Sequence, residues 1–133
     1  MSNFEKIKGY LLELEHDITQ ENTEDNLLII NDENKGICNM MLDCEGDVLV
    51  VEQHIFDIND GDSSIYKRLL QINREMIHGA FVLDEEGNRV LYRDTLEADN
   101  LDLNELEASL SALAIALVEH ADEFLTFAGK EVA

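Results

Sequence analysis

The sequence predicts an α+β fold, in which helices pack on a twisted, antiparallel sheet of five strands in the order α-β-β-β-α-β-β-α. The first and last stretches of the chain carry apolar residues at steps of three and four, as amphipathic helices do. Between them, short apolar runs are separated by turn sequences rich in Asn, Asp, Glu and Gly. These turns are too short for a parallel crossover, so we expect neighbouring strands to be antiparallel.

The first element should be a helix that begins near the N-terminus. Ser2 and Glu5 have the spacing of a capping box, which satisfies backbone N–H groups at the start of a helix. One apolar face follows, formed by Phe4, Ile7, Leu11, Leu14 and Ile18. A polar stretch at residues 19–26 breaks this pattern.

The next three elements should be strands that are joined by short turns. Their apolar runs are residues 27–30, 37–42 and 48–58, and the turns are residues 31–36 and 45–47. If Cys38 and Cys44 lie on one strand, they share a face but stand about 20 Å apart, beyond disulfide reach. We therefore expect buried free thiols, with a redox role as the alternative.

A helix and a hairpin should follow. Residues 60–63 form a turn that can cap a helix, and the apolar stripe of that helix comprises Ile65, Leu69, Ile72 and Met76. Residues 80–83 and 90–96 indicate a hairpin across the turn at residues 84–88. The second arm alternates apolar and polar residues, as a half-buried strand does.

The last helix has the clearest pattern. Asp102 and Glu105 again have capping-box spacing, and one stripe comprises Leu103, Leu106, Leu110, Leu113, Leu117 and Phe124. Between Ala112 and Val118 the sequence is apolar all round, and such a helix needs cover on two sides. The sheet should cover one side, and a second copy of the chain should cover the other, so we expect a homodimer.

An interaction surface should therefore be sought on this helix and on the long strand. The candidate residues are Leu110, Leu113, Ile115 and Leu117 on the helix, and Val50 and Ile55 on the strand. Their apolar character suits the core of the domain as well as a docking surface.

Length and charge limit the class of protein. The 133 residues are enough for one domain, which should span residues 1–133. The net charge of −21 repels phosphate backbones, so direct binding of nucleic acid is not expected. No apolar run approaches the length of a membrane span, and we expect a cytoplasmic protein.

No motif predicts catalysis, a metal or a cofactor. A calcium loop beginning at Asp57 would need Glu at its twelfth position, where the chain has Arg68. The pairs Glu13/His16 and His120/Glu123 have metal-ligand spacing, but such pairs arise by chance among thirty acidic residues. We therefore predict a protein that binds and does not catalyse.

Part of the chain resembles a known family. Residues 69–84 (LLQINREMIHGAFVLD), with their continuation through residues 87–93 to residues 100–102, are similar to the YbjN-like proteins. These proteins share the fold of type III secretion chaperones such as the CesT (Tir chaperone) family. The resemblance implies a small, acidic, often dimeric protein that holds a partner polypeptide on apolar surface, and it carries no catalytic residue.

The leading hypothesis is a chaperone-like or regulatory module that binds an unidentified protein partner. One alternative is an acidic mimic of DNA that inhibits a nucleic-acid enzyme, which the charge alone suggests. A second alternative is a small-ligand sensor with a pocket between the sheet and the last helix. Capture of the partner at rising salt separates the first two, because apolar contacts survive salt and charge contacts weaken.

Overall fold

The computed structural model describes residues 1–58 and 63–129, which form one antiparallel sheet and three α-helices. In chain order the elements are α1 (Asn3–Glu13), β1 (Asp17–Asn22), β2 (Leu27–Asp32), the short 3-10 helix η1 (Glu33–Lys35), β3 (Ile37–Glu45), β4 (Val48–Asp57), α2 (Ser63–Glu75), β5 (Ala80–Leu83), β6 (Arg89–Glu97) and α3 (Leu103–Phe127). The strand order across the sheet is β1-β2-β3-β4-β6-β5, and every neighbouring pair is antiparallel. The predicted turn at Asp60, Gly61 and Asp62 lies outside the described residues.

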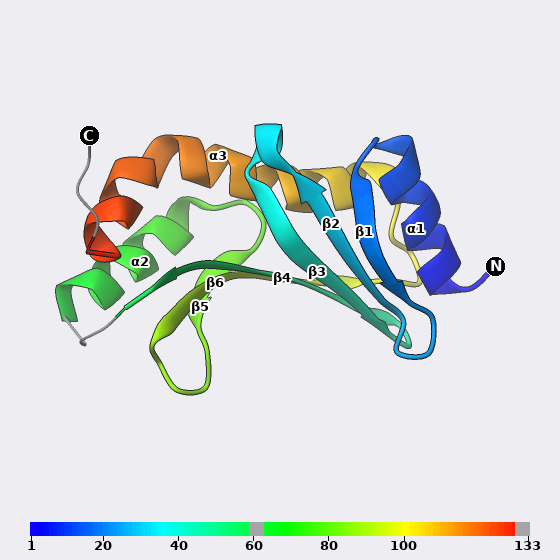
Figure 1. Cartoon of the computed structure of the whole chain (residues 1–133), viewed down its shortest axis with the longest axis horizontal. Coiled ribbons are helices and arrows are strands. Elements are labelled where there is room, and N and C mark those ends of the chain that lie inside the picture. Colours follow the sequence, from blue (N-terminus) through cyan, green and yellow to red (C-terminus); the bar gives the residue numbers. More distant parts are fainter. Residues whose placement is uncertain (59–62, 130–133) are drawn as a thin grey trace.

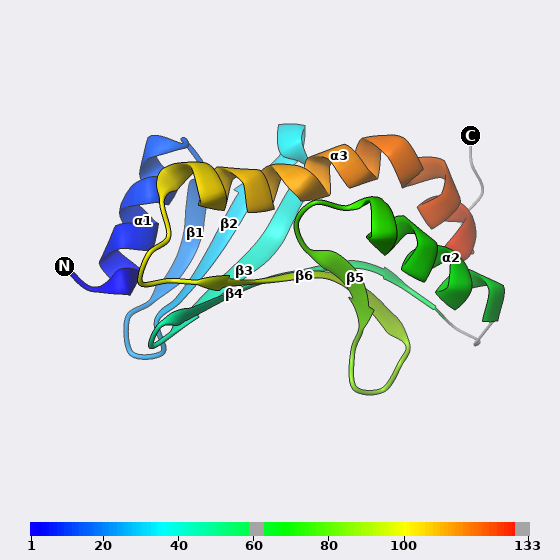
Figure 2. The same ribbon diagram turned by 180° about the vertical axis from the view of Figure 1, so that it is seen from behind.

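The three helices lie on one side of a curved sheet (Figures 1 and 2). The long helix α3 runs across the sheet, α1 lies near its N-terminal part, and α2 lies beneath its C-terminal part. The core lies between the helices and the sheet, and it includes fully buried residues from α1, α3 and the central strands. Among the helices of the described residues, none is long and apolar enough to cross a membrane.

The fold class is confirmed, but the prediction of five strands is wrong because the sheet has six. The extra strand is β1, which pairs with β2 at the edge of the sheet. Its side chains are polar and exposed except for the half-buried Ile18, so it shows no alternation of apolar and polar residues. The first helix ends at Glu13, and Glu15 reverses the chain with a φ of 63°, which places Ile18 on this strand instead of the helix.

A bulge in β3 separates the two cysteines. Asn39 adopts a φ of 48°, and the alternation shifts by one residue, so that Cys38 is exposed while Cys44 is buried. The prediction that both thiols are buried on a shared face is therefore wrong, although both are free. The buried Gln53 of β4 satisfies the irregular backbone: its Nε2 donates to Gly36 O at 3.0 Å, and its Oε1 accepts from Cys38 N at 3.1 Å.

Polar side chains fix α3 on the sheet. Asp102 caps the helix as predicted, because its side chain accepts a hydrogen bond from Glu105 N at 2.8 Å. Farther along, the fully buried Tyr92 of β6 donates its hydroxyl to Ser109 O at 2.6 Å, and burial raises the pKa of Tyr92 to about 12. Ser109 Oγ in turn donates to Asp94 Oδ2 at 2.7 Å. These bonds set the position of the helix above the strand.

At the other end of the sheet, α1 is tied to the segment that precedes α3. Ser2 Oγ accepts a hydrogen bond from Glu5 N, as the capping spacing predicts. Lys6 Nζ donates to Ala98 O at 2.6 Å, and the Tyr10 hydroxyl donates to Leu101 O at 3.2 Å.

His16, which follows α1, is a buried polar residue. Its Nδ1 lies 3.4 Å from Asp32 Oδ2 but has no well-aligned hydrogen-bond partner among the described residues. Burial lowers the pKa of His16 below its ordinary value of 6.5; Lys35 adds to this effect, and Asp32 and Glu107 oppose it. The folded protein therefore favours the neutral form of this imidazole.

Candidate functional site

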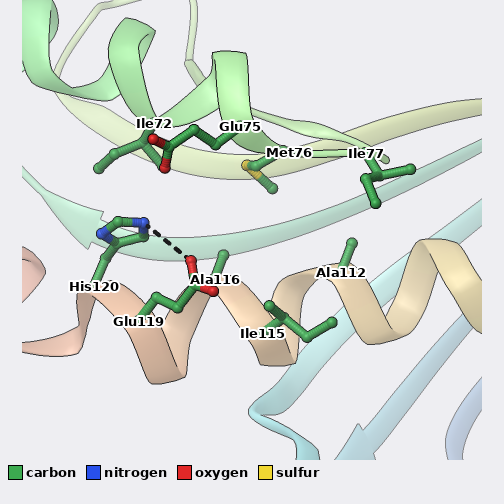
Figure 3. A pocket seen from close by; sticks show the side chains of 9 residues that line it. All are labelled: Ile72, Glu75, Met76, Ile77, Ala112, Ile115, Ala116, Glu119 and His120. Atoms are coloured by element: carbon green, nitrogen blue, oxygen red, sulfur yellow. Dashed lines mark ion pairs between the residues drawn. The ribbon is translucent and has the colours of Figure 1, made fainter.

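An apolar groove with a volume of about 240 Å³ lies between the C-terminal end of α2 and the middle of α3 (Figure 3). We call it the α2–α3 groove. Its lining residues are Ile72, Glu75, Met76, Ile77, Ala112, Ile115, Ala116, Glu119 and His120. Figure 3 shows these side chains approaching the groove from two segments that are far apart in the sequence.

The local sequence explains why this region stays apolar and open. Ala112 and Ala116 are one helical turn apart, and their small side chains leave room between the helices. Around them, three aliphatic side chains face solvent: Ile77 is 91% exposed, Val118 is 86% exposed and Ile115 is 60% exposed. Ile115 and Val118 also line a shallower hollow that continues along α3. Such a concentration of exposed aliphatic surface is typical of an interaction site.

Acidic side chains border the groove. Glu75 enters from the last turn of α2 and Glu119 from α3, and no Lys or Arg is among the lining residues. The imidazole of His120, which is largely buried, lies 3.7 Å from a carboxylate oxygen of Glu119 (Figure 3). The groove therefore combines an apolar floor with a negative border.

An ion pair joins α2 and α3 next to the groove. Arg68 donates from Nε and Nη2 to the two carboxylate oxygens of Glu123, at 2.8 and 3.0 Å. This bidentate hydrogen bonding raises the pKa of Arg68 and lowers the pKa of Glu123. His120 Nδ1 lies 3.4 Å from the same carboxylate, so the pair also contacts the floor of the groove.

A second apolar surface lies between α2 and the edge strand β5. We call it the α2–β5 surface, and it is lined by Tyr66, Leu69, Leu70, Asn73, Phe81, Val82 and Leu83, with a volume of about 360 Å³. No Asp, Glu, Lys, Arg or His is among these lining residues, and Leu70 is 71% exposed. Asn73 closes part of the sheet edge, because its side chain donates to Phe81 O at 3.0 Å and accepts from Phe81 N at 2.8 Å.

The residues predicted from the sequence for an interaction surface fall in different places. Leu110 and Leu113 are buried in the core, on the inner face of α3. Leu117 and Ile55 are partly buried and pack against that core, and Val50 is half-buried on β4. Only Ile115 lines the α2–α3 groove.

Sequence reasoning did not select Ile77 or Val118, the most exposed of the aliphatic residues beside the groove. Val118 belongs to the segment that is apolar all round, so a signal for it was present. Ile77 lies just after the end of α2 at Glu75, so the helical spacing that selected Ile72 and Met76 gives no signal for it.

Within residues 1–58 and 63–129, no group of three or more His, Cys, Asp or Glu side chains could hold a metal ion. The α2–α3 groove itself offers aliphatic contacts, two carboxylates and one imidazole.

The family of the chain follows from a match that spans almost all of it. The model of the family CesT_Tir_1 matches residues 1–130. The chain belongs to this family. The resemblance that was predicted from residues 69–102 is thereby confirmed, although no curated protein sequence gives a significant match.

Solved structures agree with the CesT_Tir_1 assignment at the level of the fold. YbjN from E. coli is 11% identical, with a TM-score of 0.67 over 90% of this chain and 91% of that chain. The HopA1–SchA chaperone–effector complex contains a chain that is 12% identical, with a TM-score of 0.61 over 95% of this chain and 94% of that chain. The Yersinia pestis type III secretion chaperone SycH, in complex with a stable fragment of YscM2, is 17% identical, with a TM-score of 0.56 over 95% of this chain and 99% of that chain. At these identities the similarity establishes a shared architecture.

Proposed function

We propose that this protein is a non-enzymatic, chaperone-like or regulatory module that binds a partner polypeptide through apolar surface. The observation that carries the proposal is the α2–α3 groove, where Ile77 and Ile115 are exposed, with the exposed Val118 in the adjoining hollow on α3. Membership of the CesT_Tir_1 family supports it, as do two similar structures that are complexes with another protein.

The driving force for binding is the burial of these aliphatic side chains. Burying an exposed Ile or Val side chain fully contributes about 1.5–3 kcal/mol. Three such side chains contribute a gross free energy of several kcal/mol, from which the loss of translational and rotational freedom must be subtracted. Further contacts are therefore needed for tight binding, and the half-buried Val50 on the sheet is a candidate for one of them.

The test is capture of the partner by the wild-type protein and by Ile115→Asp, followed by mass spectrometry. The substitution places a charge in the groove, so we expect the captured partner to be lost. Leu12→Asp is the matched control, because Leu12 is an exposed aliphatic residue on α1, outside the groove residues. Equal capture by the wild type and Ile115→Asp would refute the assignment of the site.

Salt distinguishes this proposal from the acidic DNA mimic. We expect the partner to remain bound when the salt concentration rises from about 0.1 M to about 1 M, because apolar contacts are not screened. Complete release over this range would favour the mimic, whose contacts are electrostatic.

We further propose that the protein is a homodimer and that the α2–β5 surface is its interface. In a chain with a net charge of −21, an apolar surface without charged side chains is the one that a second copy can approach with least repulsion. Light scattering coupled to size-exclusion chromatography should give the mass of a dimer, and Leu70→Asp should give that of a monomer. A wild-type monomer at tens of micromolar would contradict the proposal.

A further inference from the structure

Resting on the function proposed above, we infer that the α2–α3 groove accepts a basic segment of the partner polypeptide. An apolar side chain of that segment packs between Ile77 and Ile115, and a neighbouring Lys or Arg pairs with Glu75 and Glu119. The inference specifies the chemistry of the partner, which the proposed function leaves open.

The apolar half of this chemistry follows from the floor of the groove. Ile72 is almost fully buried, Ala112 and Ala116 are small, and Ile77 and Ile115 rise beside them (Figure 3). A volume of about 240 Å³ holds one or two aliphatic side chains and is too small for a folded element. The floor therefore selects single side chains projecting from a segment of chain.

The preference for a basic side chain follows from the two glutamates that border the groove. Glu75 and Glu119 belong to different helices, yet both line the groove, and Glu119 keeps 59% of its side chain exposed. The imidazole of His120, which lies 3.7 Å from the Glu119 carboxylate, is charged only when protonated, and Arg68, which interacts electrostatically with Glu75, is already paired with Glu123. Two carboxylates beside apolar walls, in a chain with a net charge of −21, create a negative potential that attracts Lys and Arg.

The same charges argue against a second copy as the occupant. A two-fold contact through this groove would bring Glu75 and Glu119 of both copies together, and like charges at an interface are unfavourable. The α2–β5 surface lacks that difficulty because its lining residues are uncharged. The two apolar surfaces thus differ in the charge of the molecule that each can accept.

Three short synthetic peptides test the inference. They share one Leu- and Ile-containing core, and the residues that flank this core are Lys in the first peptide, Gln in the second and Glu in the third. Fluorescence anisotropy with the full chain gives the dissociation constants at about 50 mM and about 300 mM salt. We expect the Lys peptide to bind about threefold to tenfold more tightly than the Gln peptide at low salt, and the Glu peptide to bind most weakly.

Charge variants show whether the groove produces this preference. In the double variant Glu75→Gln/Glu119→Gln, the Lys and Gln peptides should bind with equal affinity, and in Ile115→Asp binding of all three should be lost. The control is Glu85→Gln/Glu86→Gln, which makes the same change in net charge in the exposed β5–β6 turn. In this control the Lys peptide should still bind more tightly than the Gln peptide, by nearly the same factor as in the wild type.

The outcomes separate the two proposals. If the three peptides bind equally and Ile115→Asp abolishes binding, the inferred basic partner is wrong and the proposed apolar site stands. If the preference for Lys persists in Glu75→Gln/Glu119→Gln, or if no peptide binds at about 1 mM, the inference is also overturned. Equal capture of the natural partner by the wild type and by Ile115→Asp refutes the groove as the site of the proposed function, whatever the peptides do.

Discussion

Gln53 offers a sharp test of how the fold is held together. It is almost fully buried, and its amide makes two hydrogen bonds to the backbone of the bulged strand, to Gly36 O and from Cys38 N. The substitution Gln53→Met keeps nearly the same length and volume but removes both hydrogen bonds. The Gly36 carbonyl and the Cys38 amide are then left without their side-chain partner at a part-buried position.

The magnitude follows from these two groups. A buried backbone group that loses its partner costs about 1–3 kcal/mol, and the lower half of this range applies because both bonds are only part-buried. We therefore expect the free energy of unfolding to fall by about 2–4 kcal/mol. The unfolding entropy of a 133-residue domain is about 0.28 kcal/mol/K, so Tm should fall by about 7–14 °C.

The assays are thermal unfolding followed by circular dichroism and amide hydrogen exchange. Gln20→Met is the matched control, because Gln20 lies exposed on β1, and its Tm should change little. Exchange should become faster at the Cys38 amide in Gln53→Met. An equal Tm in the two variants, or an unchanged exchange rate at Cys38, would refute the role assigned to Gln53.

Three further predictions concern glycine, the sheet edge and pH. Gly79 has a φ of 72°, and a Cβ there would lie 2.5 Å from the Tyr92 ring; Gly46 has a φ of 62° with open space around it. Gly79→Ala should therefore lower the free energy of unfolding by at least about 2 kcal/mol more than Gly46→Ala, and equal losses in urea denaturation would contradict the contact. Asn73→Ala should lower the free energy of unfolding by about 1–3 kcal/mol, because the backbone of β5 loses both hydrogen bonds to the Asn73 side chain. An unchanged urea midpoint would show that water replaces the Asn73 amide. Burial lowers the pKa of His16, so the unfolded chain binds more protons, and the free energy of unfolding should fall as the pH drops below about 6.5. Between pH 7.5 and pH 5.5 the urea midpoint should therefore fall less in His16→Gln than in the wild type. Equal changes of the urea midpoint with pH in the two proteins would refute this.

The parts of the fold that the sequence predicted well are those that bury an apolar face. The stripes of α2 and α3 follow from the regular spacing of aliphatic residues, the Asp102 cap follows from its spacing to Glu105, and β5 follows from a short apolar run. The edge strand β1 escaped prediction because its side chains, apart from the half-buried Ile18, are polar and exposed. Its pairing with β2 depends on backbone hydrogen bonds and on the Thr19 hydroxyl, which donates to Ile29 O and accepts from Asn31 Nδ2. No pattern of side chains records that kind of pairing.

The candidate site was predicted only in part. Ile115 was selected because the segment around it is apolar on every side, and the structure leaves it exposed. Leu110 and Leu113 have the same apolar character in the sequence, yet they lie buried on the face of α3 that packs on the core. Periodicity orders residues around a helix, but it does not say where a neighbouring element ends and exposes one of its faces.

The sequence by itself determined the charge, the α+β class and the apolar faces from which the core is built, because these depend on composition and on spacing along the chain. Only the tertiary structure decided that α2 ends over the middle of α3, which places Glu75 and Ile77 beside Ile115 and Glu119. It also decided that Gln53 meets the bulge beside Cys38. These contacts join residues that are distant in the chain, and packing of the whole domain brings them together.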